Sequence, residues 1–379
     1  MSRAVVSRVP PSAPPRRPRP PKPSRSPAPP PEIPVGVVPG RRAILGGFLA
    51  GLLARTSPPA SASATASCAR DPPDIAAVLA LARELYGDGR LDEADLLLTT
   101  AASCSRTDPI PPESSRASSA PLLKLLGDVR VDAMRYARAV EAYDAALDAD
   151  PAGPSAPGAH FGRANAFEGL ASEARAEAEA ESADADADAE SRRLYALAVD
   201  DYSRCVELAP EAAEVSTAYF ERAQAERALG RWKDAREDYD AAATLFLARR
   251  EKKFADVSDA QAAFATFETG DLTRARARLE TLGRRLYSSD VRAALVACYW
   301  RMGEGALAED AWSKLCEMED SRCGKYGDRD WLLSYRRWTP GLADAMEDFL
   351  ALRVRPGWGG EGWGESGERR GTTTRGAET

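Results

Sequence analysis

One spacing of small and aromatic residues recurs along this chain and constrains the fold more than any other feature. In its clearest copy Tyr219 and Ala223 stand four residues apart, Gly230 follows, and Ala235 and Tyr239 repeat the interval of four. This interval places two side chains on one helix face, and glycine favours the left-handed conformation that ends a helix. The pattern predicts two antiparallel helices joined at Gly230, with Ala223 facing Ala235 where they approach closely.

The same register predicts six helical hairpins. We place them near residues 75–108, 120–153, 157–210, 216–249, 256–289 and 289–322. The alanines that pack the second helices are Ala94, Ala139, Ala198, Ala235, Ala275 and Ala308. Their intervals are unequal because of a Pro/Ser-rich linker at 109–119 and an acidic, alanine-rich insertion at 171–193. We expect a right-handed all-α solenoid over 75–322, with the insertion in solvent as a helical extension or as disordered chain.

This register resembles that of the tetratricopeptide repeat (TPR) family. The resemblance implies that the first helices line a concave groove that binds protein partners. Carried over residue by residue, it assigns the following side chains to the groove: Lys124, Phe161, Asn165, Phe220, Gln224, Arg227, Phe264, Phe267, Trp300 and Arg301.

The groove residues also bear on the kind of ligand. Members of the family that bind chaperones hold a C-terminal carboxylate with lysine and asparagine at set positions. Only Lys124 and Asn165 resemble that arrangement here, and Asp128 opposes it. We expect the aromatic side chains to be exposed, which favours an extended or helical apolar peptide as the ligand.

The N-terminus is expected to be a targeting sequence. Residues 1–64 contain ten Lys or Arg and one acid, so they carry +9, and the rest of the chain carries −16. Residues 1–40 are Pro-, Ser- and Arg-rich, as in a disordered transit peptide. Residues 41–64 combine Arg41 and Arg42, a short apolar run and small residues at cleavage-site spacing, which is typical of a twin-arginine export signal. The apolar run has twelve residues, and a membrane-spanning helix needs about 20.

Two such signals in series resemble the bipartite presequence of plastid proteins sent to the thylakoid lumen. The resemblance implies a chloroplast lumenal protein without a transmembrane helix in its mature form. A bacterial protein exported to the periplasm, with a long Pro-rich leader, is the alternative, and an uncleaved anchor is a third interpretation.

The composition argues against most catalytic functions. His160 is the single histidine, so triads and multi-histidine metal sites are excluded. His160 itself falls at a packing position of a first helix. The acidic run from Asp184 to Asp188 lacks the glycine and the bidentate acid of a calcium loop. We predict no cofactor and no metal site, and a body charged −16 would repel nucleic acid.

The cysteines leave two interpretations open. Cys316 and Cys323 flank the end of the sixth hairpin, where they either form a disulfide in an oxidising compartment or remain two thiols. A disulfide there would stabilise the C-terminal end by roughly 2–3 kcal/mol. Cys205 replaces a small residue of a second helix and is expected to be a buried thiol, and Cys68 and Cys104 are a second candidate pair.

The C-terminus is expected to cap the solenoid over residues 323–355. Thr339 and Pro340 mark a helix start, and Trp331, Tyr335 and Trp338 form a stripe that favours packing over binding. The Cys-x6-Cys and Arg-Arg-Trp-x-Pro set resembles the C-terminal end of plastid and cyanobacterial TPR proteins. Residues 356–379 are predicted to be a disordered tail.

The sequence therefore predicts a non-enzymatic scaffold for protein–protein interaction. Its expected targeting to the thylakoid lumen favours a role in the assembly or maintenance of a thylakoid membrane complex. An exported bacterial scaffold and a thiol-redox regulator that uses Cys316 and Cys323 are the alternatives.

Overall fold

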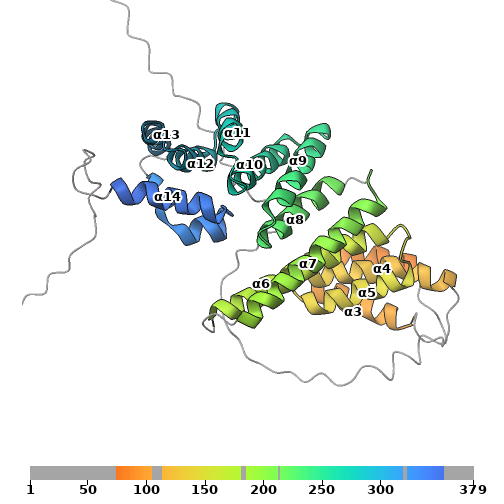
Figure 1. The fold of residues 1–379 in the computed structure, drawn as a ribbon. Coiled ribbons are helices and arrows are strands. Elements are labelled where there is room, and N and C mark those ends of the chain that lie inside the picture. The colour runs from red at the N-terminus through yellow and green to blue at the C-terminus, as the bar shows by residue number, and fades with distance from the viewer. Residues whose placement is uncertain (1–73, 105–112, 181–184, 212–213, 319–321, 354–379) are drawn as a thin grey trace, which may run out of the picture. The chain divides into compact units, whose positions relative to one another are not determined.

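The structure is a computed structural model that describes residues 74–104, 113–180, 185–211, 214–318 and 322–353. Within these ranges the chain forms helices and no strand, which confirms the all-α solenoid class. Six hairpins follow one another along the chain (Figure 1). They are α2 (Ile75–Gly87) with α3 (Leu91–Cys104), α4 (Glu113–Asp132) with α5 (Tyr136–Ala149), α6 (Ala156–Ala180) with α7 (Ala185–Leu208), α8 (Val215–Ala228) with α9 (Trp232–Ala248), α10 (Lys252–Glu268) with α11 (Leu272–Arg285), and α12 (Ser289–Arg301) with α13 (Gly305–Met318).

The packing within and between hairpins follows from the small residues. The six packing alanines and Ala223 are all fully buried, so the helices of each pair meet closely. Tyr239 of α9 is also fully buried and meets Phe220 of α8 edge-on, with 5.5 Å between the ring centroids. Each second helix also packs on the first helix of the next hairpin, and the buried apolar residues of the described ranges form four clusters along this stack.

Left-handed residues end the first helices. Gly230 has φ +73°, and the next amide, that of Arg231, donates to the carbonyl of Glu226 at 2.9 Å. Glycine adopts this conformation without the steric penalty of a Cβ atom. Met134 takes the same role between α4 and α5 with φ 57°, although it carries a side chain.

Arginines connect adjacent hairpins. Arg163 of α6 contacts Asp144 of α5 and Asp201 of α7, and Arg278 of α11 contacts Asp240 of α9 and Asp259 of α10. Each guanidinium thus joins carboxylates from two consecutive hairpins. The pairs with the exposed Asp144 and the half-buried Asp240 contribute about 1 kcal/mol or less, whereas Asp201 is buried.

The acidic insertion lengthens the third hairpin. Helix α6 continues to Ala180 and α7 begins at Ala185, so the described part of the insertion is a helical extension of both. No helix in the described ranges is long and apolar enough to cross a membrane.

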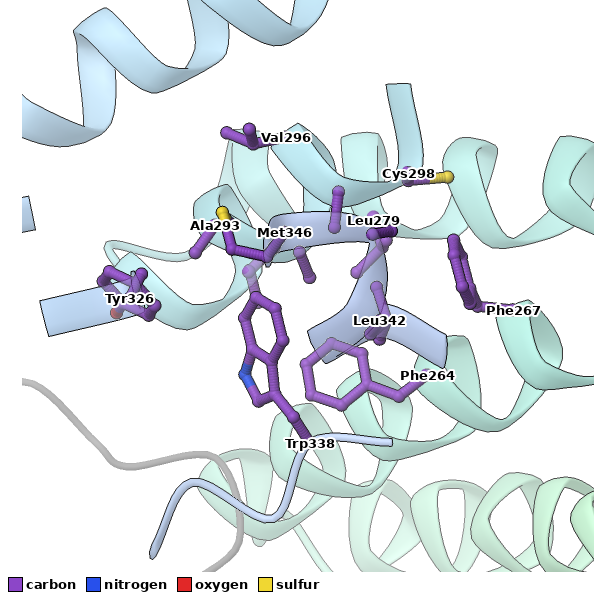
Figure 2. Close-up of a cluster of buried hydrophobic side chains, with 14 of the residues drawn as sticks. Phe264, Phe267, Leu279, Ala293, Val296, Cys298, Tyr326, Trp338, Leu342 and Met346 are labelled. Carbon is purple, nitrogen blue, oxygen red and sulfur yellow. The ribbon is translucent and has the colours of Figure 1, made fainter. Parts of the chain in front are cut away.

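The C-terminal segment, which we define as residues 322–353, covers the last two hairpins. It contains a 3-10 helix (Arg322–Gly327), a π-helix (Trp331–Tyr335) and α14 (Pro340–Arg353), and α14 packs on α10 and α12. Figure 2 shows Trp338, Leu342 and Met346 lying among apolar side chains of these hairpins. Trp338 is buried against the ring of Phe264, with 6.0 Å between centroids.

Two polar contacts anchor this segment. The buried Asp290, at the start of α12, accepts hydrogen bonds from both Arg336 and the Tyr326 hydroxyl. At the start of α14, the Gly341 amide donates to Glu268 Oε1 of α10 at 2.7 Å. Thr339 precedes the helix as expected, but its hydroxyl has no hydrogen-bond partner. Glu268 therefore supplies the cap that the sequence assigned to Thr339.

Candidate partner-binding groove

The candidate groove is the inner face of the first helices, defined here as the face that α14 covers on α10 and α12. Phe264 lies on this face eleven residues before the packing alanine Ala275, and the same interval selects Asp128 on α4 and Gln224 on α8. On α6 the acidic insertion lengthens the interval, and Asn165 takes the equivalent position. The inner face of α4, α6 and α8 is thus polar where that of α10 is aromatic.

Three predicted groove residues are in the core. Phe220, Phe264 and Phe267 are 1%, 0% and 5% exposed, so the expectation that they are exposed is wrong. Phe220 packs on Tyr239, and the C-terminal segment covers the two phenylalanines of α10. Their apolar character serves packing inside the chain and leaves no surface for a ligand.

The last predicted groove residues lie at the end of α12. Trp300 is partly buried and meets Phe349 of α14 edge-on at 5.7 Å. Arg301 is exposed. The C-terminal segment thus occupies most of the inner face of α12 as well.

On α4, Lys124 is already paired. Its ammonium donates to Asp128 Oδ2 at 2.7 Å, and the Tyr143 hydroxyl donates to Asp128 Oδ1 at 2.9 Å. Burial raises the pKa of Asp128, although both contacts favour its charged form. Gly158 of α6 leaves room for the lysine, because a Cβ atom there would lie 3.0 Å from Lys124 Cε. Asp128 therefore restrains the cation expected to meet a ligand.

On α6, a tyrosine orients the amide of Asn165. The Tyr202 hydroxyl of α7 donates to Asn165 Oδ1 at 2.7 Å, and Phe161 packs edge-on against the same tyrosine ring. Because the amide oxygen accepts this bond, the NH2 group of Asn165 remains as a donor. Phe161 is partly buried beside it.

On α8, an arginine likewise binds the oxygen of a side-chain amide. Arg227 Nε donates to Gln224 Oε1 at 3.1 Å. Gln224 is 5% exposed, and its Nε2 atom has no hydrogen-bond partner. In consecutive hairpins the amide oxygen is therefore engaged by the protein, but only the nitrogen of Asn165 lies on a partly exposed side chain, whereas Gln224 Nε2 is buried. Such donors suit peptide carbonyl or carboxylate oxygens.

The groups with catalytic chemistry are engaged in structural contacts. His160 Nδ1 lies 2.7 Å from Asp201 Oδ1, and Arg163 binds the same carboxylate. Burial opposes ionisation of Asp201, but the hydrogen bonds from Arg163 and His160 lower its pKa overall. Burial raises the pKa of the free thiols Cys205 and Cys298 to about 11 and about 12, so they are protonated at neutral pH. Among the described residues no cluster of three potential ligands could hold a metal ion.

The structure joins Cys316 and Cys323 in a disulfide, with 4.8 Å between the Cα atoms. This bond connects the end of α13 to the 3-10 helix of the C-terminal segment. Cys104 is disulfide-bonded as well, whereas Cys68 lies outside the described residues. So do the expected transit peptide and export signal at 1–64 and the tail at 356–379.

Sequence reasoning missed the tyrosines beneath the groove and the arginines of the C-terminal segment. Tyr143 and Tyr202 lie on second helices, and their hydroxyls fix the polar groups of α4 and α6. A sequence pattern that could have identified these contacts is a tyrosine on the second helix of a hairpin together with Asp or Asn at the inner position of its first helix. Arg336 and Arg337 carried no repeat register that could have placed them.

The solved structures with some similarity to this chain include helical-repeat proteins. No family model and no curated protein matches the chain. Among solved structures, TPR-like repeats of a kinesin light chain from Podosopora anserina are 19% identical, with a TM-score of 0.40, and cover 56% of this chain and 95% of that one. Pseudomonas aeruginosa pilF is 12% identical, with a TM-score of 0.41, and covers 65% and 92%. A TPR protein from Parabacteroides merdae is 14% identical, with a TM-score of 0.30, and covers 74% and 99%. The fold assignment rests on the hairpins of this chain and not on these scores.

Proposed function

We propose that this chain is a non-enzymatic TPR-type scaffold that binds an extended segment of a protein partner along the inner face of α4, α6 and α8. The observation that carries the proposal is the fixed orientation of the Asn165 amide. Tyr202 holds its oxygen, so the nitrogen of this partly exposed side chain is available to a ligand. An extended segment has backbone carbonyls along its length that can accept from such donors.

The C-terminal half of the molecule supports this use of the inner face. On α10 and α12 the equivalent surface already holds a polypeptide, the chain's own C-terminal segment. The inner face thus accommodates polypeptide on α10 and α12, and on α4, α6 and α8 its polar side chains are bound by other side chains of the protein.

We further propose that the scaffold works in the thylakoid lumen, in the assembly or maintenance of a membrane complex. The support is the arginine-rich, acid-poor N-terminal sequence together with the disulfide between Cys316 and Cys323, since such bonds persist in oxidising compartments. Export from a bacterium to the periplasm is the alternative. Sequencing the N-terminus of the mature protein from its source tests this proposal, with a start near Thr65 expected. A mature protein that begins at Met1 would exclude both locations.

The groove is tested by affinity capture from detergent-solubilised thylakoid membranes with a Lys124→Ala, Asn165→Ala double variant. We expect partners captured by the parent protein to be reduced about tenfold, which corresponds to 1.4 kcal/mol. The matched control is Lys314→Ala, which removes one lysine from an exposed ion pair on α13. If the double variant captures the same partners as the control in equal amounts, the groove assignment is wrong.

A further inference from the structure

A pocket of about 310 Å³ lies between α11, α12 and α13. Two of its lining residues, Arg292 and Leu295, come from α12. They precede the inner position of that helix, Ala297, by five and two residues, which places them on the opposite side of the helix from the inner face. The pocket is therefore separate from the groove proposed above.

Equivalent positions in the preceding hairpin show what can fill this place. Ala311, which also lines the pocket, stands three residues after the packing alanine of α13, and Arg292 stands five residues before the inner position of α12. In the hairpin of α10 and α11 the same two positions hold Arg278 and Asp259, which form an ion pair. A charged side chain of the second helix thus meets an opposite charge on the first.

Two earlier hairpins fill the place with an aspartate. Asp201 of α7 stands at the position of Ala311, and its Oδ1 atom lies 2.7 Å from Nδ1 of His160, at the position of Arg292. In α9 the position holds Asp238, which binds Arg222 of α8 through both carboxylate oxygens. In three consecutive hairpins, therefore, the second helix supplies a charged group that is bound by the first helix.

The last hairpin lacks this group. Ala311 offers no charge, and among the described residues Arg292 forms no ion pair with a carboxylate. Arg292 Nε is buried without a hydrogen-bond partner, and the side chain as a whole is partly exposed and lines the pocket. Arg284 of α11, which is exposed, adds a second positive charge to the lining. A guanidinium in such a site binds a carboxylate strongly, so the pocket can take an external anion where other hairpins supply aspartate.

Two carboxylates also line the pocket, and both have partners within the protein. Glu280 accepts hydrogen bonds from Arg276 Nε at 2.8 Å and from the Tyr299 hydroxyl at 3.0 Å. Asp310 forms an exposed ion pair with Lys314 at 2.7 Å. These acids would repel a ligand with several negative charges more than a ligand with one. The charges of the pocket therefore favour a monoanion.

The rest of the lining is apolar. Leu295 is partly buried and stands at the position that holds Arg163 in α6 and Arg222 in α8, two residues before the inner position. Leu307 of α13 is 41% exposed and lines the same pocket. A ligand with an apolar body would cover both leucines, which is favourable because it removes their surface from water.

We propose that this pocket binds a small organic monocarboxylate with an apolar body. Arg292 binds the carboxylate, in the forked geometry that guanidinium groups and carboxylates share. Leu295, Leu307 and Ala311 contact the apolar body. The volume is at the lower end of the range for small-molecule sites. This is a second binding function, on the other side of the helices from the peptide groove.

An NMR titration of the whole protein tests the pocket. The backbone amides of Gly283 and Leu295, which line it, report binding of phenylacetate, phenylacetamide, acetate and inorganic phosphate. We expect phenylacetate to bind about tenfold more tightly than each of the other three. Phenylacetamide lacks the charge, acetate lacks the apolar body, and phosphate lacks the apolar body and carries more negative charge.

Removing the cation should remove the preference for the acid. Arg292→Gln is expected to weaken phenylacetate binding about tenfold and to leave phenylacetamide binding unchanged. The matched control is Arg301→Gln, which removes an exposed arginine from the same helix outside the pocket and should leave both affinities unchanged.

Supplying the missing carboxylate from the chain should close the site. Ala311→Asp places an acid where α7 and α9 carry Asp201 and Asp238, so it should lower phenylacetate affinity at least about tenfold without lowering the melting temperature. Ser313→Asp adds the same charge on the exposed side of α13 and should leave the affinity unchanged. Thermal melts of all four variants check that they fold.

Four results overturn the proposal. Equal binding of phenylacetate and phenylacetamide would show that Arg292 is not an anion partner. Acetate or phosphate binding as tight as that of phenylacetate would show an anion site without a place for an apolar body. An affinity unchanged in both Arg292→Gln and Ala311→Asp would place the ligand elsewhere, and amides of Gly283 and Leu295 that respond to no compound would remove the site. Partner capture along the inner face does not depend on these results.

Discussion

Helices α6 and α10 occupy equivalent places in the repeat, yet their inner faces differ in chemistry. At one register position α6 carries Asn165, whose amide is oriented by Tyr202, and α10 carries Phe264, which is buried under Trp338. The difference follows from what lies on each face: the C-terminal segment packs on α10, and a covered position must be apolar or fully paired.

The comparison shows that one register position can encode either core or binding surface. The apolar inner positions of α10 and α12, Phe264 and Ala297, join the largest core cluster of the described residues. The polar inner positions of α4, α6 and α8 are tied to tyrosine or arginine partners. Polarity at this position, more than aromatic character, marks the face proposed to bind a ligand.

The largest expected loss of stability comes from removing the ring of Phe264, which the C-terminal segment covers. Phe264→Ala should lower the free energy of unfolding by about 3–5 kcal/mol, because it removes a fully buried ring and leaves a cavity beside Trp338. Urea denaturation of the purified variant measures the change. A loss below about 1 kcal/mol would mean that the C-terminal segment does not seal this face in solution.

Opening the disulfide should have the next largest effect. A Cys316→Ser, Cys323→Ser variant is expected to lose about 2–3 kcal/mol, because the bond closes a short loop between α13 and the C-terminal segment. Amide hydrogen exchange should localise the loss to α14 and the inner faces of α10 and α12. Faster exchange in α4 or α6 instead would contradict the division into covered and uncovered halves.

A smaller loss of stability is expected at Asn165, which occupies on α6 the position that Phe264 occupies on α10. Asn165→Ala removes a side-chain hydrogen bond to Tyr202 and should destabilise the protein by about 1 kcal/mol, as measured by the same urea titration. Partner binding should weaken more than stability. If Asn165→Ala and Phe264→Ala were equally destabilising, the two positions would share one structural role and the comparison would fail.

The covered and uncovered halves should also differ in their response to pH. Asp290, under the C-terminal segment, is fully paired, whereas Glu226 Oε2 in α8 is buried without a partner. Burial, with a smaller effect of Asp238, raises the pKa of Glu226 to about 8. The folded chain thus retains a proton that the unfolded chain releases near its ordinary pKa, and stability falls as pH rises through this window up to about 8.

Glu226→Gln should reduce that pH dependence. The glutamine cannot ionise, so the decrease in melting temperature between about pH 5 and pH 8 should be smaller than in the parent protein. Thermal melts across this range measure the slope, with Lys314→Ala as the surface control. An unchanged slope would show that Glu226 is ionised in the folded protein at neutral pH.

The repeat was predictable from sequence because its determinants are local. The interval between Ala223, Gly230 and Ala235 encodes two helices and the turn between them within a few residues. The covering of α10 was not predictable, since its contacts join distant residues: Gly341 and Glu268 are 73 positions apart. For this reason Phe264 and Phe267 were assigned to an exposed groove.

The candidate site was predictable in part for the same reason. Lys124, Asn165, Gln224 and Arg227 followed from register alone, because a helix fixes which face each residue occupies. The orientation of Asn165 depends on Tyr202 of α7, whose distance from α6 along the chain is lengthened by the insertion. Arg336 lies outside the repeat altogether, and only the folded chain brings it to Asp290.

The C-terminal segment also imposes an order on folding during synthesis. Hairpins α2 to α9 find their principal neighbours as soon as the next hairpin has emerged, because their contacts are mostly sequential. The inner faces of α10 and α12 remain open until Trp338 and Phe349 have been made, at roughly 5–20 residues per second. The last-made residues therefore determine when the chain hides its largest apolar surface, and a chain truncated before them would expose Phe264 and its neighbours to aggregation or to quality control.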